Sequence, residues 1–133
     1  MSLKMRYFTL EEAQGHLPKI KGLCASIQET KNLIEEKVAA WNEVREKVDD
    51  VEGALMQVQV EALAGRLEEQ IAAVAEMGCL VKDIDKCLVD FPARIEGKEA
   101  YLCWMKGEEE IRFWHGITEG YQGRKPVIKE SVQ

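Results

Sequence analysis

The spacing of apolar residues is the feature that most limits how this chain can fold. In one segment, apolar side chains recur every seven residues, at Ile20, Ile27, Ile34, Trp41 and Val48. The same spacing resumes further on, at Val60, Leu67 and Val74. Sevenfold spacing puts apolar side chains on one face of a helix. The sequence therefore predicts two amphipathic helices over 18–48 and 54–77, which form a coiled-coil-like antiparallel hairpin through a polar turn at 49–53.

A short helix is expected ahead of the hairpin. Thr9 and Glu12 have the spacing of a capping box, and Phe8 and Ala13 have that of a hydrophobic staple. Pro18 cannot donate the backbone hydrogen bond that a continuing helix needs, but it is tolerated in a first turn. The pattern thus predicts a separate helix over 9–17 and a break before Pro18.

The sevenfold spacing stops at Gly78, and short extended runs follow. Runs of strand-forming residues occupy 80–84, 87–93, 100–105 and 110–115, and Glu96 to Lys98 has the composition of a hairpin connection. These runs predict an antiparallel β-meander of three or four strands over 79–115, with Pro92 at an edge or near a strand end. Residues 116–133 are expected to form a loop and tail. The fold class is α+β in one domain spanning 1–133.

Composition excludes several classes of protein. Hydrophobic residues make up 46% and charged residues 32%, which is typical of a folded domain. The net charge is −6, and residues 1–78 hold fourteen Asp/Glu against nine Lys/Arg. An acidic helical surface disfavours binding to a phosphate backbone.

No apolar run is long enough to cross a membrane, and no secretory signal begins the chain, so the sequence predicts a cytoplasmic protein. Residues 1–4 read as a leader, with Met5 as the natural start.

The four cysteines show no metal-binding spacing. Cys24, Cys79, Cys87 and Cys103 include no CxxC pair, and neither histidine completes a zinc-finger pattern. In a reducing compartment, buried thiols that pack as small hydrophobic groups are the favoured interpretation.

The meander brings the chemically versatile residues together. Asp90, Cys103 and His115 lie on segments that neighbouring strands would place side by side, and Glu119 follows His115 by four residues. Imidazole, carboxylate and thiol groups are ligands of divalent metals, so a metal or small-ligand site is one hypothesis. Cys103 activated by His115 as a nucleophile is another, although packing of Cys103 in the core is favoured over it.

Charged and aromatic residues surround this candidate site. Asp90 interrupts an apolar strand and needs a partner if it is buried, for which Arg94, Arg112 and Arg124 are candidates. The glycine-rich segment 120–126 could bind an anion through Arg124, but a structural turn is the favoured interpretation. The predicted aromatic wall of the site consists of Trp104, Trp114 and Tyr121.

The order of these motifs resembles a known family. Phe8 to Ala13 with Leu17-Pro18, then Leu88 to Ala93, Leu102 to Trp104, Gly107-Glu108, Trp114-His115 and Gly120 with Gly123-Arg124 are similar to the prokaryotic family of domain of unknown function 2203 (DUF2203). The family has no established activity, and some relatives carry a cell-division label. Tyr121 stands where phenylalanine is common, and Cys79 and Cys87 have no counterpart in the pattern.

The resemblance also ranks residues for testing. It implies that signature positions cluster in the sheet and tail, while the helical middle varies in length and composition. The positions to test first are Asp90, Cys103, Trp104, Glu108, His115 and Arg124. Glu108 thereby joins Arg94 and Arg124 as an anion-binding or structural candidate.

Two functional hypotheses follow. In the favoured one, the helical hairpin is a structural or interaction module that forms a homodimer or another homo-oligomer through its apolar stripe. In the alternative, the meander holds a small ligand or a divalent metal near Asp90 and His115, and the chain could be an enzyme. The sequence identifies no substrate or protein partner.

Overall fold

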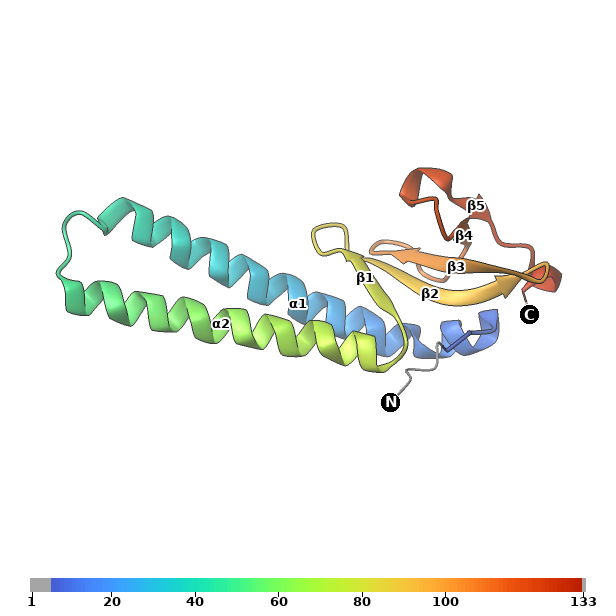
Figure 1. The fold of residues 1–133 in the computed structure, drawn as a ribbon, viewed down its shortest axis with the longest axis horizontal. Coiled ribbons are helices and arrows are strands. Elements are labelled where there is room, and N and C mark those ends of the chain that lie inside the picture. Colours follow the sequence, from blue (N-terminus) through green and yellow to red (C-terminus); the bar gives the residue numbers. More distant parts are fainter. Residues whose placement is uncertain (1–5, 133) are drawn as a thin grey trace.

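The computed structural model describes residues 6–132 and shows a long helical hairpin with a sheet at its base (Figure 1). The helices are α1 (Leu10–Val44) and α2 (Asp50–Glu76). The strands are β1 (Leu80–Asp83), β2 (Leu88–Ile95), β3 (Lys98–Met105), β4 (Phe113–Gly116) and β5 (Lys125–Pro126). The predicted α+β class is confirmed. The leader expected at residues 1–4 lies outside the described part of the chain.

Helix α1 begins as predicted but does not break at Pro18. The Thr9 hydroxyl accepts a hydrogen bond from the Glu12 amide at 3.0 Å, and the Glu12 carboxylate accepts one from the Thr9 amide at 3.1 Å, so the capping box is present. The separate helix expected over 9–17 is instead the start of one 35-residue helix. Leu17 and Ile20 are both buried in the same core, and this shared burial holds the helix together across the proline.

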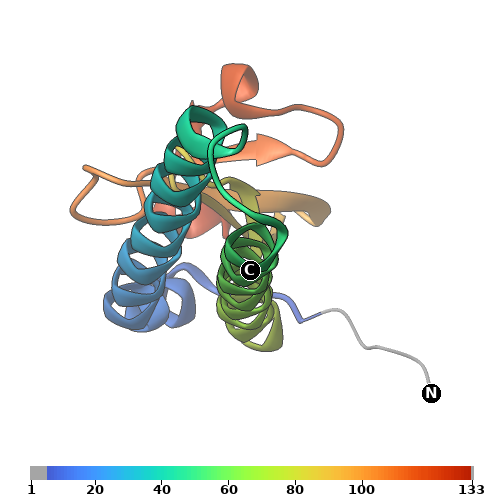
Figure 2. The same cartoon turned by 90° about the vertical axis from the view of Figure 1, so that its left-hand side faces the viewer.

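The turn of the hairpin lies earlier than the sequence predicts. Asp49 caps α2, because its side chain accepts a hydrogen bond from the Glu52 amide at 2.9 Å. Residues 50–53, expected in the turn, therefore form the first turn of the helix. Gly53 lies where the helices meet, and an added Cβ there would be 3.0 Å from the Trp41 ring. Figure 2 shows the helices side by side, with their connecting loop toward the viewer.

The sheet is a meander of five strands rather than three or four. Its order is β1-β2-β3-β4-β5, and every neighbouring pair is antiparallel. Strand β5 has only two residues, too few to show an alternating pattern, which is why the sequence predicted a loop there. The β2–β3 hairpin turns through Glu96 and Gly97, both with positive φ, as a two-residue connection requires.

Pro92 occupies a position in β2 that needs no backbone donor. Strand β1 pairs with β2 only as far as Asp90, so the side of β2 at Pro92 that faces away from β3 has no strand partner. The Pro92 carbonyl there accepts a hydrogen bond from the Phe8 amide at 2.7 Å. At Pro92, β2 is therefore a sheet edge on one side, as expected, although β2 is an internal strand where β1 pairs with it.

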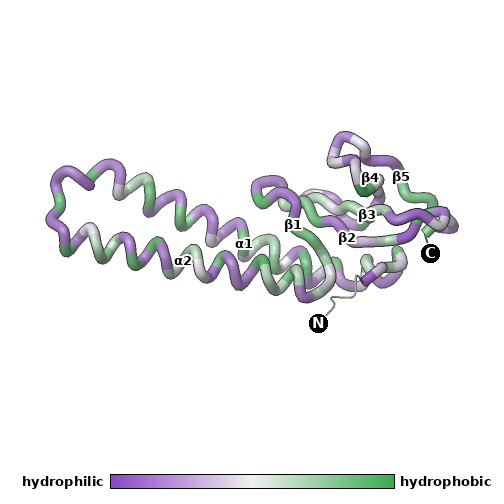
Figure 3. The backbone as a smooth tube through the Cα atoms, viewed as in Figure 1, coloured by the Kyte–Doolittle hydropathy of each residue, from purple (hydrophilic) through white to green (hydrophobic). Residues whose placement is uncertain are grey.

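One core joins the sheet to the base of the hairpin. Buried side chains from α1 end at Thr30, and Val74 is the buried residue of α2. Beyond this base the two helices extend away from the sheet, and apolar and polar residues alternate along both (Figure 3). None of the helices among residues 6–132 is long and apolar enough to cross a membrane.

A side chain of α1 also anchors the loop between β3 and β4. The Gln14 amide nitrogen donates to the Ile111 carbonyl at 3.2 Å, and the Gln14 side-chain oxygen accepts from the Ile111 amide at 2.9 Å. Ile111 itself is buried. The backbone and the buried side chain of Ile111 thus both hold the connection that leads into β4 against α1.

Because the core lies at the base of the hairpin, a leucine-to-alanine substitution should affect stability at the base much more than at the far end. Leu102 is fully buried in β3, and Leu55 in α2 is 58% exposed. Leu102→Ala should lower the free energy of unfolding by about 2–5 kcal/mol, and Leu55→Ala should change it by less than about 0.5 kcal/mol. Urea unfolding followed by circular dichroism measures both. Equal losses for the two variants would contradict the assignment of the core to the base.

Candidate functional site

The two faces of the sheet have different surroundings. Val89, Phe91 and Ala93 of β2 are buried in the core shared with the helices. Side chains alternate along a strand, so Asp90 points to the opposite face. On that face the chain after β4 returns over the sheet, since Arg124 lies over the ring of Phe113, which is paired with Cys103, and donates to the Cys103 carbonyl at 3.2 Å. Residues 117–124, which we call the C-terminal loop, therefore cover the face that holds Asp90.

Three side chains from three adjacent strands meet beneath this loop. Asp90 of β2 is directly opposite Cys103 of β3, and His115 of β4 is opposite Tyr101, two residues from Cys103. Ligand atoms of Asp90, Cys103 and His115 all lie within 4.8 Å of one another, and all three residues are buried. The sequence hypothesis named these three residues, and the structure brings them together. We call Asp90, Cys103 and His115 the buried triad.

Hydrogen bonds fix the imidazole of His115 on both sides. Its Nδ1 lies 2.9 Å from the Gly116 carbonyl oxygen, and its Nε2 lies 3.0 Å from Asp90 Oδ1. A carbonyl oxygen only accepts, so Nδ1 carries a hydrogen and donates it. A further proton is then shared between Nε2 and Asp90 Oδ1. The other oxygen, Asp90 Oδ2, is buried and has no hydrogen-bond partner among the described residues.

This geometry argues against Cys103 as a nucleophile activated by His115. Both ring nitrogens of His115 already face oxygen atoms, so neither is available to accept the thiol proton. Burial raises the pKa of the Cys103 thiol to about 12, and the nearby Asp90 carboxylate adds to the rise. The thiol of Cys103 is therefore protonated near neutral pH unless a cation replaces its proton.

Arg124 and Glu108 form an ion pair beside the triad. Arg124 Nη2 lies 2.6 Å from Glu108 Oε1, and both side chains are largely buried. The guanidinium also stacks on the Phe113 ring, 4.2 Å from its centroid. Glu108 is itself held in place, because its carboxylate accepts a hydrogen bond from the Met105 amide at 2.7 Å. The positive charge of Arg124 is thus neutralised within the protein, which makes it a structural cation and not a free anion clamp.

Glu119 lies near the triad in sequence but has other partners. Its carboxylate accepts hydrogen bonds from the Gly116 amide at 2.8 Å and from Lys125 Nζ at 2.7 Å. Lys125 and then the Gly116 amide hold the pKa of Glu119 below its usual range. The residue is exposed, and its role here is to close the turn after β4. Glu119 was a candidate metal ligand, and the structure does not bring it into the triad.

The remaining candidates are dispersed. Arg94 lies over the Tyr7 ring, 4.5 Å from its centroid, and Arg112 pairs with Glu110, so neither arginine is the partner of Asp90. Trp104 and Trp114 project from the helix-facing side of the sheet, where Trp104 is buried in the core and Trp114 packs at its edge. Tyr121 does lie beside the site, with its ring centroid 5.3 Å from the Arg124 guanidinium.

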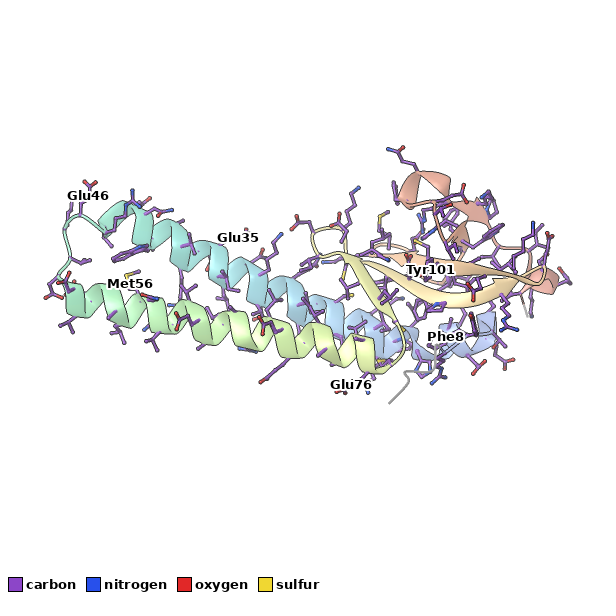
Figure 4. The ribbon with its side chains drawn as sticks, viewed as in Figure 1. Phe8, Glu35, Glu46, Met56, Glu76 and Tyr101 are labelled. Carbon is purple, nitrogen blue, oxygen red and sulfur yellow. The ribbon has the colours of Figure 1, made fainter. Side chains whose placement is uncertain are left out.

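Two aromatic residues at the site were not among the predicted residues. Tyr101 lies beside His115 with ring centroids 5.5 Å apart, and Phe113 lies beneath Arg124. Figure 4 labels Tyr101 on the sheet, far from Met56 at the other end of the hairpin. Both missed residues are two positions from a triad member in the same strand, and this alternation was the signal that could have identified them.

The raised pKa of Cys103 predicts a thiol that resists alkylation. At pH 8, a pKa of about 12 leaves roughly one thiol in ten thousand as the reactive thiolate. In folded protein, iodoacetamide at pH 8 should leave Cys103 unmodified, and in urea it should modify all four cysteines. Mass spectrometry of peptides measures both. Modification of Cys103 at equal rates in the two states would contradict the burial of the triad.

The turn that Glu119 closes predicts a strict requirement for glycine at one position. A Cβ on Gly123 would lie 2.6 Å from Glu119 Cβ, whereas a Cβ on Gly120 would meet nothing within 4 Å. Gly123→Ala should make opening of the C-terminal loop easier by about 1–3 kcal/mol, and Gly120→Ala should change it by less than about 0.5 kcal/mol. Hydrogen exchange of the Gly116 amide measures this opening. Equal protection in both variants would refute the proposed packing.

Comparison with known proteins agrees with the motifs found in the sequence. The family model described as Uncharacterized conserved protein (DUF2203) matches residues 6–127. Searches of the curated proteins and of the solved structures find no match to this chain. The family match covers most of the chain, including both helices, the sheet and the triad. The predicted resemblance is confirmed, and the chain belongs to the DUF2203 family.

Proposed function

We propose that this chain is a metal-binding protein in which the buried triad holds one divalent cation. The observation that carries the proposal is the convergence of one carboxylate, one thiol and one imidazole within 4.8 Å, all of them buried. In this reading the sheet and the C-terminal loop form the functional part, and the hairpin is the scaffold that buries the other face of the sheet.

The orientation of His115 supports this reading. Histidines that bind metals commonly donate their second ring N–H to a carbonyl or carboxylate, which fixes the ring and the tautomer. His115 has this arrangement, because its Nδ1 donates to the Gly116 carbonyl and its Nε2 faces Asp90, another member of the triad. A cation in place of the proton between Nε2 and Asp90 Oδ1 would meet a lone pair on each side.

The donor set favours zinc over magnesium or calcium. Thiolate and imidazole are ligands of Zn²⁺ and of similar transition metals, whereas Mg²⁺ and Ca²⁺ prefer oxygen atoms alone. A tetrahedral Zn²⁺ ion with ordinary bond lengths keeps its ligand atoms about 3.5 Å apart. Side chains within 4.8 Å of one another would need shifts of roughly 1 Å to reach this spacing. Asp90 Oδ2, which has no described partner, is available as a further ligand atom.

The net charge of the triad is compatible with binding of a divalent cation at a buried site. Without a cation, the triad holds one thiol proton and one shared proton, and its net charge is zero. Binding of Zn²⁺ with release of these two protons leaves the net charge at zero, so no uncompensated charge is buried in either state. Arg124 is nearby, but its charge is balanced by Glu108 at 2.6 Å and does not oppose a cation.

The test uses the 133-residue chain after metal has been removed by chelation. Calorimetric titration with Zn²⁺ should give one ion per chain, and Zn²⁺ at one hundred times its dissociation constant should raise the free energy of unfolding by about 2.7 kcal/mol. Cys103→Ala and His115→Ala should each abolish this increase. Absence of Zn²⁺ binding by the wild-type chain would refute the proposal.

Two matched variants control for loss of a cysteine or a histidine. Cys79→Ala removes another buried thiol whose pKa burial also raises to about 12, and His16→Ala removes the second histidine. Both should keep the stabilisation by Zn²⁺. Should the triad variants fold poorly, Co²⁺ bound to wild-type protein provides a separate measurement, because a thiolate-to-cobalt charge-transfer band reports ligation by cysteine. Bound Co²⁺ without this band would exclude Cys103 as a ligand.

A further inference from the structure

The part of α2 that extends away from the sheet has a second apolar face that no described residue covers. Val51, Leu55 and Val58 are 77%, 58% and 60% exposed. Spacings of four and three residues place them on one side of the helix. Ala62 and Gly65 continue this spacing, and a Cβ added to Gly65 would meet nothing within 4 Å. We call the face formed by Val51, Leu55, Val58, Ala62 and Gly65 the outer face of α2.

The outer face is distinct from the side of α2 that packs on α1. Gly53 lies against Trp41, and Met56 and Val60 line the space between the helices next to it. These inner positions are about half a turn around the helix from Val51, Leu55 and Val58. The end of α2 farthest from the sheet is therefore apolar on two opposite sides, of which α1 covers one. A helix with a wide exposed apolar face is typical of a surface that binds another helix.

The charges that α2 itself places beside this face are almost all negative. Helix α2 contains six acidic residues and a single basic residue, Arg66. Glu52 lies along one edge of the outer face, and Glu61 and Glu68 lie along the other, at helical positions next to the apolar row. Their side chains are exposed, and none of the three forms an ion pair among the described residues.

We propose that the outer face of α2 binds a basic amphipathic helix from another protein. Apolar side chains of that helix would cover Val51, Leu55 and Val58, and its Lys or Arg residues would pair with the acidic edges. A second copy of this chain fits less well, because two α2 helices placed face to face would bring twelve acidic residues together with only two basic ones. The homo-oligomer expected from the sequence is untested by the structure and is an alternative outcome of the experiment.

The test probes the full chain with a synthetic helical peptide that has leucine on one face and lysine along both edges. Binding is followed by fluorescence anisotropy of the labelled peptide. Val58→Asp, which removes an apolar contact but adds a negative charge, should weaken binding at least tenfold. Ala40→Asp adds the same charge at an exposed position of α1 and should leave the affinity within about twofold, since no apolar contact is lost.

A second pair of variants tests the acidic edges. Glu61→Lys combined with Glu68→Lys should weaken binding at least tenfold and reduce its dependence on salt. Equal binding by wild type and Val58→Asp would overturn the proposal, because the peptide would then be held by charge alone. Sedimentation equilibrium provides the other decisive result: a wild-type dimer that Val58→Asp converts to monomers would assign the face to a second copy. Neither outcome bears on the metal site, which lies at the opposite end of the molecule.

Discussion

The pairing of β2 with β3 is the constraint on which the rest of the structure depends. Eight residues of each strand are in register, from Leu88 opposite Met105 to Ile95 opposite Lys98. This register places Phe91 and Leu102 together on the helix-facing side and Asp90 and Cys103 together on the other side. A slip of one residue would exchange the two sets, moving a carboxylate into the core and a phenylalanine out of it. The hydrophobic core and the triad are thus two results of a single alignment.

The two faces of the sheet have complementary roles. The helix-facing side is apolar and gains its stability from burial, so it needs the base of α1 to cover it. The other side buries polar groups, which must be paired with one another or with a bound cation. The C-terminal loop makes this possible, because the Arg124–Glu108 ion pair ties it to the connection between β3 and β4, and the Lys125–Glu119 ion pair holds its own turn closed. Without that cover Asp90 and His115 would face solvent and have little electrostatic influence on each other.

Much of this arrangement could be predicted from the sequence. The sevenfold apolar spacing predicted the hairpin, and the change at Gly78 predicted the meander that brings Asp90, Cys103 and His115 together. The predicted break at Pro18 was wrong, because the loss of one backbone donor there is outweighed by tertiary burial of Leu17 and Ile20. The partners of Arg124 and Glu119 were missed for another reason. They depend on how residues 116–127 fold back, and a segment without periodicity contains no local signal for that path.

The end of side-chain burial at Thr30 has a consequence for how the molecule moves. Backbone hydrogen bonds in the outer part of the hairpin are protected by partly exposed side chains alone, whereas those at the base share the core with the sheet. Such a chain opens in separate cooperative units, the outer turns of the helices first and the base with the sheet last. Folding would then nucleate where α1 meets the sheet, and the outer turns of α1 and α2 would form last, after this base has packed.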